Sequence, residues 1–278
     1  MLNSPVRPTP YLLILVLLLS MLTGCATSPT GRTQFILISP DAAILESEAA
    51  YLGTVRQLDE EDMLVNDPLT VARVARITGR LVSIAVKDFP ESGDWKWSVA
   101  IVDDTETVNA WCMAGGRMAV YTGLFGQLEL TDDEFAQIMG HEISHALANH
   151  TAERMSRAIA TAAGVAVIGA ASDNSGAAMA GASVIANVAL TLPNSRDAEN
   201  EADVMGMVLA TKAGYDPEAA VTLWQKMGDL SDDRPAEFLS THPAPENRQA
   251  VLNTMIPRML QVNPGRTKAP IHPVTVVQ

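Results

Sequence analysis

The sequence predicts a single, mostly helical α+β domain with a small antiparallel sheet beside a long central helix. Two observations predict it: apolar residues recur at helical spacing along much of the chain, and three short β-type runs lie between Lys96 and Thr122. With 47% hydrophobic and 18% charged residues, the 278-residue chain has ample material for a packed core. We expect the domain to span residues 41–260.

The earlier elements follow from periodicity and turn residues. Helices are expected over residues 41–58, capped by Asp41, and from Pro68 onward. The β-type runs predict strands at residues 97–102, 108–113 and 117–121, and Gly115-Gly116 supplies the turn between the last two.

The later elements begin with a helix that Thr131 starts, because Glu134 three residues on completes a capping-box pattern. Residues 158–192 are almost entirely small or apolar and predict two helices in a hairpin, which could also be a mobile flap. A membrane-spanning pair is the alternative, although each arm is short for a bilayer. Further helices are expected from Ser195 to Gly214, after Asp216-Pro217, and up to Met255.

The first 24 residues predict a secretory signal. Arg7 precedes an apolar run at residues 11–19 that is too short to span a bilayer comfortably. LTGC at residues 22–25 resembles the bacterial lipobox, which implies cleavage before Cys25 and a fatty acyl chain, such as palmitate, on the mature N-terminus. The alternative is an uncleaved signal anchor with a cysteine in range.

The lipobox resemblance also implies a location. Ala26 follows the cysteine where an Asp would signal retention in the inner membrane, so the resemblance implies an outer-membrane lipoprotein facing the periplasm. Residues 25–40 are rich in Thr, Ser, Pro and Gly, and we expect a lipidated tether there. Residues 261–278, with three prolines and little periodicity, are expected to be disordered. Cys112 has no disulfide partner if Cys25 carries lipid, and a buried apolar role is expected for it.

The charge excludes one class of partner. The formal net charge is −13, and no stripe of Lys and Arg occurs anywhere in the sequence. Nucleic-acid-binding proteins present clustered basic residues to the phosphates. We therefore expect no nucleic-acid partner.

The pattern HEISH at residues 141–145 carries the chemistry. Positions four apart in a helix project from one face, so His141 and His145 can share one zinc ion. Glu142 is rotated by about 100° and stands beside the metal, where it can take a proton from an acidified water molecule. The alternative is a surface helix with solvated side chains. His150, five positions past His145, points to another face and is expected to be structural.

A hydrolytic zinc site needs a third protein ligand. Glu199 and Asp203 are four positions apart on the edge of an apolar helix face, and either carboxylate could serve. Glu201 lies about 200° around the helix from Glu199 and cannot face the same ion.

The HEISH pattern, followed by SRDAENEAD at residues 195–203, resembles the M48 family of metallopeptidases. The resemblance implies a gluzincin-type metalloprotease domain with one zinc ion per chain. It assigns the third ligand to Glu199 and the orientation of a ligand histidine to Asp203. It further implies peptide-bond hydrolysis of unfolded or misassembled envelope proteins, and contact with the outer-membrane assembly machinery. A largely latent holdase or assembly factor that retains the protease fold is the alternative.

Two further segments carry the resemblance. Residues 108–116 resemble the family's strand along which substrate lies, which implies such a role for Asn109, Ala110, Gly115 and Gly116. Ala114 replaces the family's usual proline, and the alternative is a plain core hairpin.

Near the C-terminus, Thr241-His242-Pro243 and Arg248 resemble the family's late His-Pro…Arg element. His242 would either stabilise the oxyanion of the reaction or occupy the open zinc position and hold the enzyme latent. Arg248 would pair with a carboxylate of the site and contribute to catalysis.

Overall fold

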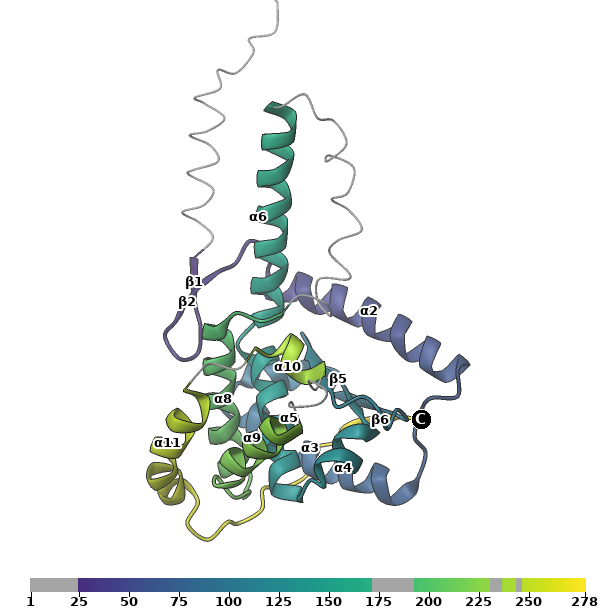
Figure 1. The fold of residues 1–278 in the computed structure, drawn as a ribbon, viewed down its shortest axis with the longest axis vertical. Coiled ribbons are helices and arrows are strands. Elements are labelled where there is room, and N and C mark those ends of the chain that lie inside the picture. Colours follow the sequence, from purple (N-terminus) through teal and green to yellow (C-terminus); the bar gives the residue numbers. More distant parts are fainter. Residues whose placement is uncertain (1–24, 172–192, 231–236, 244–246) are drawn as a thin grey trace, which may run out of the picture.

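The computed structural model describes residues 25–171, 193–230, 237–243 and 247–278, without side-chain detail for 163–171. The predicted signal peptide and the second arm of the predicted 158–192 hairpin lie outside the described residues. The described elements are mostly helical with one small principal sheet, so the predicted α+β class is confirmed (Figure 1).

The described helices follow the predicted order closely. Thr131 and Glu134 form both hydrogen bonds of the capping box, whereas Ser39 rather than Asp41 caps the first helix. The bounds are α2 Pro40–Glu60, α3 Pro68–Asp88, α4 Thr122–Leu128, α5 Asp132–Leu147, α6 His150–Ala171, α8 Arg196–Lys212, α9 Ala219–Leu230, α10 Glu237–Thr241 and α11 Arg248–Val262, with a 3-10 turn at Pro90–Asp94. Within the described ranges no helix has the length and apolar character needed to cross a membrane.

The principal sheet has the order β4-β5-β3-β6, with bounds β3 Ser98–Val102, β4 Ala110–Met113, β5 Arg117–Tyr121 and β6 Thr275–Val277. The predicted antiparallel pairing occurs between β4 and β5. β3 runs parallel to β5, because the chain after β3 passes over to the far side of β5 before β4 begins. The sheet is therefore mixed, and β4 lies at one edge of the described sheet.

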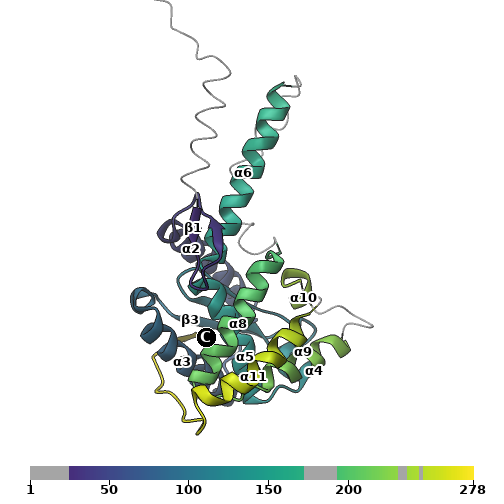
Figure 2. The same ribbon diagram turned by 90° about the vertical axis from the view of Figure 1, so that its left-hand side faces the viewer.

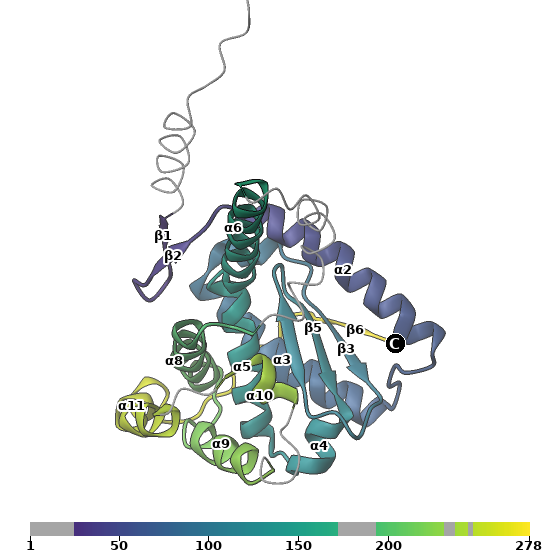
Figure 3. The same ribbon diagram turned by 45° about the horizontal axis from the view of Figure 1, so that its top comes forward.

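The two faces of the sheet are covered by different helices (Figure 3). Val99 and Ile101 of β3 pack with α3 and α5 in the main core, whereas Ala100 and Val102 face the other way, toward Val55 and Leu58 of α2. Successive strand residues point to opposite faces, which explains this division. The edge strand β4 also contacts α5.

The C-terminal tail differs from the expected disorder. β6 pairs in parallel with β3, and the His272 amide donates to the Gly79 carbonyl at 2.9 Å. A Cβ at Gly79 would come within 2.6 Å of the His272 carbonyl oxygen, so a glycine is needed where the tail crosses α3. Periodicity could not predict this ordering, because it depends mainly on backbone hydrogen bonds and a close backbone approach.

The expected tether also differs from the structure. β1 Cys25–Thr27 and β2 Thr33–Phe35 pair as an antiparallel hairpin beside α6 (Figure 2). We call residues 25–35 the N-terminal hairpin. Arg32 of this hairpin forms ion pairs with Glu153 of α6 and Glu201 of α8. Buried acidic partners far away in sequence therefore hold a segment whose composition is typical of a linker.

Candidate metal centre

The site is built where α5 and α8 cross at two glycines. A Cβ at Gly140 would lie 2.8 Å from the Gly206 carbonyl oxygen, and one at Gly206 would lie 2.7 Å from the His141 amide nitrogen. Real Cβ atoms do not approach backbone so closely, so only glycine allows this crossing. The close approach brings Asp203 of α8 to 3.0 Å from His141 of α5.

Four buried side chains converge above this crossing. One ligand atom from each of His141, His145, Glu199 and His242 lies within 4.8 Å of the others. The Nε2 atoms of His141 and His145 are 3.0 Å apart, and each lies 3.4 Å from an oxygen of Glu199. Nδ1 of His242 lies 3.3 Å from Nε2 of His141 and 3.1 Å from Oε1 of Glu199.

These separations suit zinc. Two donors bound tetrahedrally at about 2.1 Å from an ion are about 3.4 Å apart, close to the spacing of the four groups here. Two imidazoles and a carboxylate form a donor set that zinc prefers, and all four side chains of the cluster are buried.

The charge of the cluster also calls for a cation. Burial opposes protonation of His141, but hydrogen bonds with Asp203 and Glu199 raise its pKa to about 10. Burial would raise the pKa of Glu199, yet His242, His145 and His141 hold it well below its usual range. The two buried carboxylates thus favour a positive charge beside the ring nitrogens, a place that a metal ion fits.

Arg248 bonds the carboxylates of both Asp203 and Glu199. Its Nε donates to Oδ2 of Asp203 at 2.6 Å and its Nη2 to Oε2 of Glu199 at 2.8 Å. The guanidinium stacks over Trp224 with its central carbon 3.8 Å from the ring centre. The predicted pairing of Arg248 with a site carboxylate is therefore present, and it fixes both acidic groups in place.

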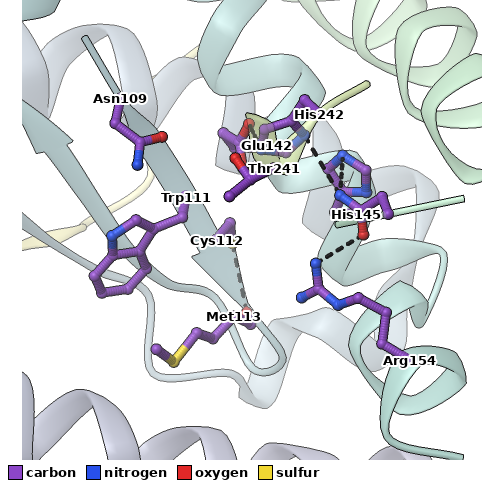
Figure 4. Close-up of a pocket in the computed structure, with 10 residues that line it drawn as sticks. Asn109, Trp111, Cys112, Met113, Glu142, His145, Arg154, Thr241 and His242 are labelled. Carbon is purple, nitrogen blue, oxygen red and sulfur yellow. Dashed lines mark hydrogen bonds and ion pairs between the residues drawn. The ribbon is translucent and has the colours of Figure 1, made fainter. Parts of the chain in front are cut away.

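A pocket opens from this cluster toward the sheet (Figure 4). Glu142, His145 and His242 lie on one side of it, and Trp111, Cys112 and Met113 of β4 lie on the other. Burial raises the pKa of Glu142, and its Oε1 accepts no hydrogen bond from any residue the structure describes. This carboxylate is therefore placed to accept a proton inside the pocket.

The edge of β4 presents backbone groups beside this pocket. The Tyr121 amide donates to the Asn109 carbonyl, so antiparallel alternation points the N–H and C=O of Ala110 and Cys112 away from β5. The Val108 carbonyl, two residues before Ala110, also points away from β5, but it is already paired because it accepts from the Phe238 amide. Among the described residues, the unpaired part of this edge is therefore short, and it lies opposite Glu142 across the pocket.

The predicted glycines, Gly115 and Gly116, lie at the turn between β4 and β5. Gly115 and Gly116 adopt φ of +79° and +77° at the β4–β5 turn, packed against Ile44 and Trp97. Asn109 lines the pocket, and its side-chain amide donates to Glu237. Asn109 thus borders the site, the Ala110 side chain lies in the main core, and the two glycines shape the turn.

Three site residues escaped the sequence-based prediction. Asn194 lies 3.4 Å from both His145 and His242, and its oxygen accepts from half-buried Arg154. His150 contacts His145 directly. The position of Asn194 directly before Ser195, the predicted start of the helix that carries Glu199, was a usable signal. Arg154 and His150 left none, because the turn between α5 and α6 decides where they point.

An HExxH helix, a buried carboxylate from a second helix and a sheet edge facing both define a metal-dependent peptidase. A family model described as Peptidase family M48 matches residues 68–256, and the chain belongs to that family. Its members use zinc, and the donor set described above agrees with that metal.

Named relatives come from mitochondria and bacteria. Mitochondrial metalloendopeptidase OMA1 of Saccharomyces cerevisiae is 27% identical over 84% of this chain and 69% of its own length. The Homo sapiens metalloendopeptidase OMA1 is 30% identical over 86% of this chain and 47% of its own. The beta-barrel assembly-enhancing protease of Escherichia coli is 30% identical over 70% of this chain and 41% of its own. The chain thus spans less than half the length of the last two.

Proposed function

We propose that this chain is a zinc endopeptidase that degrades misfolded or misassembled proteins of a bacterial cell envelope. The observation that carries the proposal is the convergence of His141, His145 and Glu199 beside the Glu142 carboxylate and the free edge of β4. These three side chains would hold one zinc ion per chain.

The reaction is divided between the metal and the protein. When bound, zinc would polarise the scissile carbonyl and acidify a water molecule. Glu142 accepts the proton of the attacking water and passes it to the leaving amine, and its raised pKa suits both transfers. Asp203 holds the ring of His141 through Nδ1, and Arg248 fixes Glu199.

Substrate is held as an added strand. The outward N–H and C=O groups of Ala110 and Cys112 bond an extended peptide whatever its side chains. Folded proteins rarely offer such a free extended segment, whereas unfolded chains do. This mode of binding supports a quality-control role, and the likeness to the beta-barrel assembly-enhancing protease supports envelope substrates and assembly machinery as partners.

His242 holds the site latent in this proposal. Its Nδ1 is as close to His141 and Glu199 as the ligand atoms are to one another, which supports a fourth donor rather than an oxyanion group. The same observation favours the second candidate function, a largely latent holdase that retains the protease fold. The two functions differ in whether the site cleaves once His242 is removed.

The envelope location rests on the N-terminus. LTGC at residues 22–25 supports lipidation of Cys25, and Ala26 supports passage to the outer membrane with the domain in the periplasm. A Cys25→Ala variant should lose metabolically incorporated palmitate and leave the outer-membrane fraction. Unchanged labelling and fractionation would remove the lipoprotein assignment while leaving the peptidase proposal intact.

The decisive experiment for the activity uses Glu142→Gln. The purified variant is expected to bind about one zinc per chain, as the wild type does, and to lose cleavage of an unfolded casein-type substrate. Metal analysis and gel-based cleavage of both proteins test it. Equal cleavage by wild type and variant would overturn the role of Glu142, and absence of zinc from the wild type would overturn the metal site.

A further inference from the structure

A line of hydrogen bonds runs from His145 to the N-terminal hairpin. Nδ1 of His145 lies 2.7 Å from Nδ1 of His150, and Nε2 of His150 lies 3.1 Å from Oε2 of Glu201. Oε2 of Glu201 also accepts from Nε of Arg32 at 2.8 Å. The first three residues are each 5% exposed or less, so no solvent competes along this line.

The partners assign the protons. Glu201 accepts from Arg32, so its carboxylate accepts again from Nε2–H of His150. The Nδ1 of a neutral His150 is then an acceptor, and Nδ1 of His145 must carry a hydrogen and donate to it. This tautomer leaves the lone pair of His145 on Nε2, the atom that faces His141 and Glu199.

The turn between α5 and α6 creates this contact. Asn149 adopts a left-handed conformation with φ of +56°, and α6 starts at the next residue. Counting five positions along one helix pointed His150 away from His145, but the two residues lie on different helices. Asn tolerates a positive φ better than most residues, which permits the sharp turn.

Arg32 connects the hairpin to this line through two acidic groups. Its Nη1 and Nη2 donate to the two oxygens of Glu153 at 3.0 and 2.7 Å, while Nε donates to Glu201. A planar guanidinium held at three nitrogens has little freedom to rotate. The orientation of the Glu201 carboxylate is therefore set by a residue of the N-terminal hairpin.

We propose that His150 is a positioning residue for His145, and that the N-terminal hairpin maintains it through Arg32 and Glu201. The proposal builds on the zinc site of the proposed function. It makes metal affinity depend on residues 25–35, a segment more than 100 residues away from the ligand in sequence.

The test measures zinc binding by the purified full chain in competition with a chromogenic chelator, alongside the visible spectrum of the Co²⁺-substituted protein. His150→Leu removes the acceptor for His145 and is expected to weaken zinc about 10- to 100-fold and to alter the Co²⁺ bands. His150→Gln can accept with its oxygen and donate with its nitrogen, so it should restore most of the affinity. His272→Gln removes a histidine remote from the cluster and should change nothing.

The hairpin is tested by Arg32→Gln, with Arg76→Gln as the matched control. Arg76 pairs with Asp132 elsewhere on the surface, so its variant should bind zinc as the wild type does. Arg32→Gln should lose affinity toward the lower end of the range, about 10-fold. Wild-type affinity in Arg32→Gln would overturn the part assigned to the hairpin.

Circular dichroism of the metal-free proteins shows whether each variant folds. A folded His150→Leu protein with wild-type zinc affinity and Co²⁺ spectrum overturns the proposal. If that variant does not fold, His150→Asn takes its place with the same expectation, because its shorter side chain cannot reach both partners. Failure of the wild type itself to bind zinc would instead remove the proposed function.

Discussion

Nδ1 of His242 lies 3.3 Å from Nε2 of His141, a separation suited to two donors of one tetrahedral ion. The ring also stacks on Phe238, with centroids 4.3 Å apart and planes inclined by 20°. His242 follows α10 and its amide donates to the Phe238 carbonyl, so ring and backbone are held by the same short helix. Displacement of His242 from the cluster therefore requires α10 to move or the ring to leave its stacking partner.

Removal of this ring should release the enzyme. His242→Ala is expected to raise basal cleavage of an unfolded substrate roughly 10-fold, if the closed state dominates by about that ratio. Initial rates at equal zinc loading measure it, with Phe238→Leu as a second variant that weakens only the stacking. A fall in rate would assign His242 to oxyanion stabilisation instead, and no change would remove it from the site.

If substrate adds to β4 as a strand, the N–H of every second substrate residue should bond to β4. N-methylation of a peptide substrate at a residue whose N–H bonds to β4 should lower kcat/KM about 10-fold, the effect of one lost hydrogen bond. Methylation of the neighbouring residue, whose N–H points away, should have little effect. Steady-state kinetics of the methylated series test this, and uniform sensitivity at every position would contradict binding along the strand.

The helix crossing predicts that a glycine-to-alanine change destabilises the protein at Gly206 but not at Gly53. Gly206→Ala should destabilise the protein by about 1–3 kcal/mol and weaken zinc binding, because its Cβ would meet the backbone at His141. Gly53→Ala, at an exposed position of α2, meets no atom within 4 Å and should stabilise the protein by about 0.5–1 kcal/mol. Urea unfolding of the metal-free proteins compares them. Equal effects would show that α5 and α8 can separate without cost.

The Arg32 contacts predict a pH-dependent stability. Burial would raise the pKa of Glu201, but hydrogen bonds with His150, Ser28, Thr30 and Arg32 hold it far below the ordinary value near 4.3. A depressed folded pKa contributes stability above the unfolded pKa, and this contribution is lost as pH falls through the folded value.

Arg32→Gln should therefore cost about 3 kcal/mol near pH 7 and progressively less below about pH 4. Thermal unfolding of the metal-free proteins across this range measures the difference. Arg76→Gln is the control, since its half-exposed pair with Asp132 contributes about 0–1 kcal/mol. A constant penalty from pH 7 to pH 3 would contradict the role of the ionised Glu201.

The local pattern of the sequence determined most of the helices and the core of the site. Residues four apart in a helix lie on the same face by geometry alone. The sequence was therefore enough to pair His141 with His145 and Glu199 with Asp203. Caps such as Thr131 with Glu134 predicted helix starts for the same reason, because every partner lies within one turn.

Tertiary structure decided what lies between elements. Only the crossing at Gly140 and Gly206 brings the carboxylates of α8 to the histidines of α5, and only the turn at Asn149 sets His150 against His145. The sequence predicted a tether at residues 25–40 and disorder at 261–278, because strands of three residues are too short to carry a periodic signal. Their order comes from ion pairs and backbone hydrogen bonds to residues far away in sequence, which no local pattern contains.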